Sequence, residues 1–167
     1  MNILRKIAVV SILLSPMAAN ADLIVFDNFG PSDSYDGTWG WAINSYYTQG
    51  MQFTASGTGF LSSVELAFTN VPVGESVTLE LFSDSGGMLG KLLQDLSFTS
   101  TGGPIETAFA SEKSLLKTGT DYWLVGIYSG LGSWQWNNTG GVGLLARSSQ
   151  GEPFTYLTET QLSLIHI

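Results

Sequence analysis

The sequence predicts an all-β fold: an antiparallel, jelly-roll-like β-sandwich in a single domain. Apolar and polar residues alternate with period two in short runs, as they do in strands with one buried face. Glycine, proline, asparagine, aspartate and serine cluster between the runs, and the 20 glycines of the chain suit many tight turns. One run, Asp121 to Tyr128, is apolar at nearly every position, which is typical of a central strand buried on both faces.

The first element of the chain is a secretory signal, which we assign to residues 1–21. Arg5 and Lys6 precede an uncharged apolar run, and Ala19-Asn20-Ala21 provides the small residues of a signal peptidase site. The apolar run is much shorter than the roughly 20 residues that a membrane span needs. We therefore expect export, cleavage before Asp22, and no membrane span in the mature chain.

The predicted strands follow in order along the mature chain. The clearest alternating runs cover residues 64–68, 77–81 and, more weakly, 105–109. Residues 89–96 carry leucines at helical spacing, but Gly90 and the short length favour a strand or one loose turn. No linker or internal repeat interrupts the chain, so we expect one domain.

The C-terminal end is unusual, because the chain stops after an apolar hexapeptide, residues 162–167. A sandwich ordinarily ends with a paired strand and then a polar tail. We hypothesise that residues 161–167 are a truncated or non-native tail, which places the β-sandwich domain at residues 22–160. The alternative is that the last residues form a genuine final strand.

Composition excludes several classes of function. The part of the chain after the signal has four basic and fourteen acidic residues. The resulting formal charge of −10 disfavours nucleic acid and anionic lipid as partners. The absence of cysteine excludes thiol nucleophiles, cysteine-ligated zinc and iron–sulfur clusters. The single histidine, His166, is one residue from the end, where packing cannot hold it as a catalytic base or a metal ligand. We expect a protein that is not an enzyme and has no catalytic residues.

Glycoside hydrolysis is the alternative that these exclusions leave open, because it needs only two facing carboxylates. The candidates are Glu65 and Glu80, each flanked by apolar residues in an alternating run. The alternation turns both side chains away from the buried face, so we expect them to face solvent.

A calcium site is the cofactor hypothesis that the sequence raises. Asp27, Asp33 and Asp36 lie close together in a segment rich in turn residues, and Asp84 begins an Asp-Ser-Gly-Gly turn. Such turns offer the oxygen ligands that Ca²⁺ takes. The competing interpretation is that each aspartate hydrogen-bonds its own backbone in an Asx turn, and we favour it at every position; otherwise we expect no cofactor.

Two tryptophan pairs are the candidate ligand-binding residues. Trp39 and Trp41 bracket Gly40, and Trp134 and Trp136 bracket Gln135. Residues at i and i+2 of a strand project from the same face, so each pair predicts two rings side by side. Such a surface stacks sugars in carbohydrate-binding modules, but aromatic rings equally fill sandwich cores, and we favour the core. For Trp123, within the most apolar run, we expect a core position.

Five short motifs, in order, resemble those of the choice-of-anchor R domain. They are FDNFGPSDSYD with GWAI (residues 26–36 and 40–43), LSSVELA (61–67), LELFSDSGG with LG (79–87 and 89–90), GTDYWL (119–124) and WQWN (134–137). Together they span most of the chain from Phe26 to about Tyr156.

The resemblance implies an exported bacterial β-sandwich followed by an anchoring tail, often of the PEP-CTERM type that an exosortase processes. Glu152-Pro153 is not that motif, because no apolar helix follows it. The resemblance implies a location outside the cell or on the outer surface of a Gram-negative-type bacterium, and it transfers no catalytic residue. The resulting hypothesis is a non-catalytic surface or matrix domain, structural or binding, with extracellular polysaccharide as its partner; the alternative is a carboxylate-based glycan hydrolase.

Overall fold

The structure, a computed structural model, describes residues 23–165, and these residues form strands, turns and loops without a helix. The predicted signal segment and His166 lie outside the described residues. In chain order the strands are β1 (Tyr35–Asn44), β2 (Tyr47–Thr54), β3 (Gly59–Phe60), β4 (Ser63–Thr69), β5 (Ser76–Asp84), β6 (Leu89–Thr99), β7 (Ile105–Ala110), β8 (Leu115–Leu116), β9 (Asp121–Ile127), β10 (Leu131–Asn137), β11 (Val142–Ser149), β12 (Thr155–Thr160) and β13 (Leu164–Ile165). The predicted all-β fold is confirmed.

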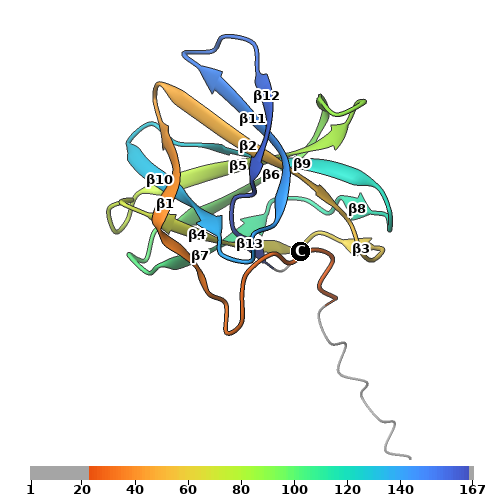
Figure 1. Cartoon of the computed structure of the whole chain (residues 1–167), viewed down its shortest axis with the longest axis horizontal. Coiled ribbons are helices and arrows are strands. Elements are labelled where there is room, and N and C mark those ends of the chain that lie inside the picture. The colour runs from red at the N-terminus through yellow and green to blue at the C-terminus, as the bar shows by residue number, and fades with distance from the viewer. Residues whose placement is uncertain (1–22, 166–167) are drawn as a thin grey trace, which may run out of the picture.

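One long antiparallel sheet makes up the domain and curls over its own core (Figure 1). Its strand order is β1-β10-β4-β7-β6-β5-β9-β2-β11-β12, and β3 and β8 form a separate pair. The first strand of this path, β1, is joined by a short turn to the eighth, β2, and the side chain of Gln49 in β2 donates a hydrogen bond to Ala42 O in β1. The curl therefore brings the two ends of the path together as two layers of a sandwich-like domain.

The space between the layers is filled by the side chains that the period-two pattern points inward. Ile43, Met51, Leu66, Leu79 and Trp134, from five different strands, are all fully buried. Residues 89–96 extend as part of β6 rather than as a helical turn, in agreement with the strand interpretation.

Strand β9 is buried on both faces, as its continuous apolar run predicts. Leu124 points into the main core, whereas Trp123 is fully buried on the opposite face of the sheet. Tyr156 of β12 covers Trp123 in an edge-to-face contact, with the ring centroids 5.4 Å apart. Trp123 is thus a core residue as expected, but of a small second layer outside the curl.

The segment after β12 belongs to the packed domain. Leu162, Ser163 and Leu164 are fully buried. Ser163 N donates to Gln135 O of β10, and Leu164 pairs with Leu66 of β4. This segment therefore fills the gap where β10 and β4 diverge, and the domain extends beyond the expected boundary at residue 160, as in the alternative interpretation of a genuine final strand.

The segment before β1 is hydrogen-bonded to the same segment after β12. Asn28 Nδ2 donates to Leu162 O, and Leu164 N donates to Asn28 Oδ1, each at 2.8 Å. Phe29 and Ala67 form a small cluster on the outer face of β4. In the part of the chain that is described, no helix is long and apolar enough to cross a membrane.

Candidate ligand-binding site

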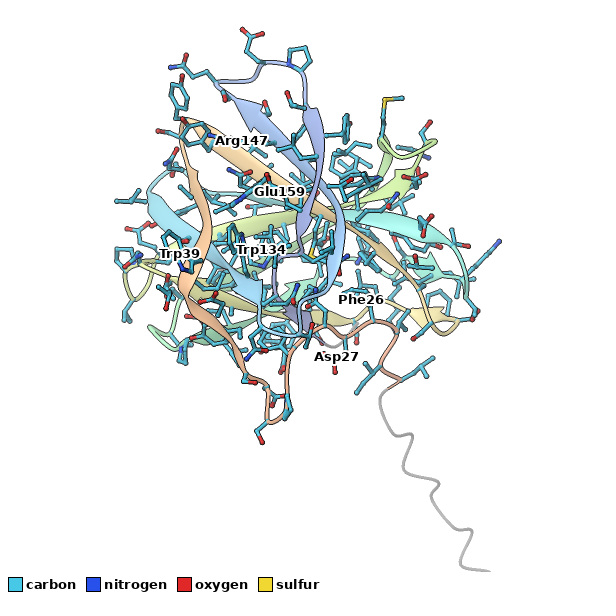
Figure 2. The ribbon with its side chains drawn as sticks, viewed as in Figure 1. Phe26, Asp27, Trp39, Trp134, Arg147 and Glu159 are labelled. Carbon is cyan, nitrogen blue, oxygen red and sulfur yellow. The ribbon has the colours of Figure 1, made fainter. Side chains whose placement is uncertain are left out.

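The four candidate tryptophans have different environments, although the sequence predicts them in two equivalent pairs (Figure 2). Trp134 is fully buried in the core, and Trp41 and Trp136 are half-buried and pack against that core. Trp39 is 63% exposed. The tryptophans therefore form no continuous flat platform: three serve the core, and Trp39 presents its ring to solvent.

A bulge in β1 explains the exposure of Trp39. Asp36 pairs with Trp136 and Gly40 pairs with Gln135, so three residues of β1 bulge out opposite a single step of β10. Asp36 Oδ1 accepts hydrogen bonds from Thr38 N (2.8 Å) and Trp39 N (3.2 Å), which close the bulge. The i, i+2 rule does not apply across such a bulge, so Trp39 and Trp41 do not share one regular face.

The backbone of the bulge is also held from the neighbouring strand. With the Gln135 amide oriented to satisfy both of its atoms, Nε2 donates to Asp36 O and Trp39 O, each at 3.2 Å, and Oε1 accepts from Thr69 Oγ1 and Ser133 Oγ. Gln135 is 4% exposed, so these hydrogen bonds are sheltered from water. The exposed ring of Trp39 therefore rests on a rigid backbone.

The three aspartates of the calcium hypothesis do not converge. Asp27 Oδ1 accepts from Phe29 N in an Asx turn, and Asp36 closes the β1 bulge. Asp33 is exposed at a turn with φ of +56°. Within residues 23–165 no group of three or more acidic or histidine side chains is placed to hold a metal ion. The geometry at Asp27 and Asp36 is that of Asx turns, and calcium binding stays a prediction.

The Asp84 turn has a structural role. Asp84 Oδ1 accepts hydrogen bonds from Gln52 Nε2 (2.7 Å) and Trp123 Nε1 (2.8 Å), and Oδ2 accepts from Gly87 N (3.0 Å). Burial by itself raises the pKa of Asp84, but these hydrogen bonds outweigh it and hold the pKa below its ordinary value of 3.8. The carboxylate thus ties the β5–β6 turn to the buried indole.

The glutamates of the hydrolase hypothesis do not face each other. Glu65 lies in β4 and Glu80 in β5, and β7 and β6 separate them, which corresponds to about 14 Å across the sheet. Glu80 instead lies directly opposite Asp95 of β6. Burial, and then the charge of Asp95, raises the pKa of Glu80 above its ordinary value of 4.5.

A different group of residues lies beside the core, on the inward-facing side of strands β2 and β11. Met51 of β2 and Leu145 of β11 are a buried cross-strand pair. Two residues further toward one end of the domain, the same face carries the pair Gln49 and Arg147. Because side chains alternate along a strand, these polar residues continue the inward-facing rows of the core.

Aromatic rings hold the guanidinium of Arg147. Its Cζ lies 4.4 Å from the ring centroid of Tyr47 and 6.0 Å from that of Trp41, within the usual reach of cation–π contacts. Figure 2 shows Arg147 between the β1–β2 hairpin and β11. We call Trp41, Tyr47, Gln49 and Arg147 the mouth cluster.

The mouth cluster borders a hollow of about 380 Å³, the Arg147 hollow, which lies along the β11–β12 hairpin. Its lining residues are Arg147, Ser149, Glu152, Pro153, Thr155 and Leu157. The volume is at the lower end of the range for small-molecule sites. The hollow combines a cation, hydroxyl groups and apolar surface, the groups that contact a sugar unit.

Of the mouth cluster, the sequence singled out only Trp41. Trp41, Tyr47 and Gln49 come from the consecutive strands β1 and β2, whereas Arg147 of β11 lies about a hundred residues further along the chain, and the pairing of β2 with β11 brings them together. One signal was available: Arg147 is the only arginine after residue 5, and it follows Leu145 at the spacing of an inward-facing row.

Comparison with known protein families finds no family model that matches the chain. The search of curated proteins finds no match either.

Proposed function

We propose that this chain is an exported, non-catalytic domain of the cell surface or extracellular matrix that binds polysaccharide. The observation that carries the binding role is the mouth cluster, in which an arginine rests on two aromatic rings beside the Arg147 hollow. The proposal of export rests on the sequence pattern of residues 1–21. The proposed surface location rests on the resemblance to the choice-of-anchor R domain, which is often followed by an anchoring tail of the PEP-CTERM type; the notable motif of that tail is not present in this sequence.

Trp39 supports the binding role with a second aromatic surface. A tryptophan that is 63% exposed gains little for folding, and its rigid bulge keeps the ring available for stacking against a sugar face. Phe60 of β3 has the same exposed fraction, 63%, on a different part of the domain, which makes it a matched control.

A glycan array probed with the full-length chain, produced with its own signal, tests the binding role. We expect binding to extracellular polysaccharides, weakened by Trp39→Ala and unchanged by Phe60→Ala. A wild-type protein that folds but binds no polysaccharide would overturn the binding role. Equal losses with both variants would show adhesion through any exposed aromatic ring and would overturn the role of Trp39.

Export is tested separately. Expression in a Gram-negative bacterium, followed by fractionation and N-terminal sequencing, should find the chain outside the inner membrane and beginning at Asp22. An uncleaved chain in the cytoplasm would overturn the proposal of export.

The alternative, a carboxylate-based glycan hydrolase, has one observation in its favour. Glu80 and Asp95 are a cross-strand pair of carboxylates, and a raised pKa such as that of Glu80 suits a general acid. If this alternative holds, the folded chain hydrolyses a glycan on the array, and both Glu80→Gln and Asp95→Asn abolish the hydrolysis. Unchanged glycans after long incubation would contradict it.

A further inference from the structure

We infer that the mouth cluster binds the carboxylate of a single uronic acid unit in an otherwise neutral glycan, with the guanidinium of Arg147 as its partner. A polyanionic glycan is disfavoured by the formal charge of −10 after residue 21. The inference rests on the proposed polysaccharide-binding function and deepens it by naming the charge that the ligand carries. Three observations support it: the missing counter-ion of Arg147, the unpartnered polar atoms of the cluster, and the lining of the hollow.

The guanidinium of Arg147 has no carboxylate partner among residues 23–165. Arginine stays charged at all ordinary pH values, and a half-buried charge is costly to leave unpaired. Acidic residues outnumber basic ones by fourteen to six in the chain, so partners for a structural ion pair were available. The fold instead surrounds this cation with aromatic rings, which leaves its carboxylate-binding edge for a ligand.

The polar atoms of the mouth cluster are also incompletely satisfied. Arg147 Nε and Gln49 Oε1 are buried and have no hydrogen-bond partner within the protein, although the two residues are cross-strand neighbours. Gln49 is only 2% exposed. Buried polar atoms without partners are few in native proteins. The surrounding strands therefore supply no acceptor for Arg147 Nε, as expected for a guanidinium that is not part of a structural ion pair.

The lining of the Arg147 hollow suits a sugar rather than a bare anion. Ser149 and Thr155 offer hydroxyl groups in the same hollow as Arg147, and Pro153 and Leu157 offer apolar surface for a ring face. Glu152 lines the same hollow and carries the same sign of charge as a uronate. The charge of Glu152 repels that of the ligand, so the effect of Glu152→Gln on the affinity shows whether the ligand is anionic.

The experiment is calorimetric titration of the full-length chain with an oligosaccharide that carries one glucuronic acid unit and, as the neutral counterpart, with the methyl ester of the same oligosaccharide. We expect the acid to bind at least about tenfold more tightly than the ester, the fold-change typical of a hydrogen bond to a charged group. Arg147→Gln should remove that difference, and Glu152→Gln should strengthen acid binding severalfold. Lys113→Gln, which removes one exposed positive charge elsewhere, should change neither affinity.

Each result decides between the inference and the function on which it rests. Equal binding of acid and ester, unaffected by Arg147→Gln, overturns the inference and leaves polysaccharide binding intact. If neither oligomer binds and the glycan array is also blank, the proposed function fails with the inference. A thermal melt of each variant checks folding. If Arg147→Gln does not fold, the exposed Glu152→Gln variant decides, and acid binding that it does not strengthen overturns the inference.

Discussion

Trp134 Nε1 donates a hydrogen bond of 2.8 Å to the carbonyl oxygen of Ser163, and both residues are fully buried. This contact joins the largest side chain between the two layers to the segment that follows β12. Ser163 is in turn held by Gln135 O, which accepts from both its backbone N and its Oγ. The segment is therefore a structural part of the core.

Leu164→Ala should destabilise the domain by about 2–5 kcal/mol, because it leaves a cavity between β4 and β10. Leu131→Ala is the matched control: Leu131 is 68% exposed, so its truncation should cost less than about 0.5 kcal/mol. Urea unfolding followed by tryptophan fluorescence measures both. Equal effects of the two variants would contradict the placement of residues 162–164 in the core.

Gly40→Ala should destabilise the domain by more than about 1 kcal/mol, the usual cost of forcing an atom into a packed space. A Cβ at Gly40 would lie 2.5 Å from Trp134 O, a backbone atom that cannot move away cheaply. Gly37, in the same strand, is the control, because its nearest neighbour would be 3.9 Å away. A melting temperature for Gly40→Ala equal to that of Gly37→Ala would show that β1 and β10 are not so close.

Asp84→Asn should destabilise the domain by about 1–3 kcal/mol, because the amide cannot accept all the hydrogen bonds that the carboxylate accepts. The pKa of Asp84 is lowered in the folded state, so its stabilising contribution is present above pH 3.8 and is lost as the pH falls below that value. Unfolding free energies measured from pH 7 to pH 3 should fall less steeply for Asp84→Asn. Asp33→Asn, at an exposed turn, is the control and should change the unfolding free energy at pH 7 by less than about 0.5 kcal/mol.

Glu80→Gln should stabilise the domain at pH 7, by up to about 1 kcal/mol, because like charges directly opposite each other on neighbouring strands repel. The pKa of Glu80 is raised in the folded state, so its unfavourable contribution is absent below pH 4.5 and appears as the pH rises through the raised value. The gain should therefore vanish near pH 4. Glu112→Gln is an exposed control, and a gain that persists at pH 4 would exclude charge repulsion as the cause.

Much of the fold could be predicted from the sequence. The run from Asp121 to Tyr128 predicts a strand buried on both faces, and residues 64–68 predict one with Val64, Leu66 and Phe68 inside; the structure has both. These predictions succeed because a period of two is a local property of a strand. The tryptophan pairs show the limit of that rule, since a bulge that depends on Asp36 and Gln135 decides the exposure of Trp39.

The sequence by itself determined the class of fold, the strands with clear alternation or a continuous apolar run, and the Asx turns at Asp27 and Asp36, because all of these depend on neighbours within a few residues. Only the tertiary structure decided which tryptophans are core, where residues 162–164 pack, and that Arg147 meets Tyr47 and Trp41. Those contacts join strands far apart in the chain, and the path of a curling sheet sets them. The pattern along any one strand cannot encode that path, because alternation fixes which face a side chain occupies and not what lies opposite.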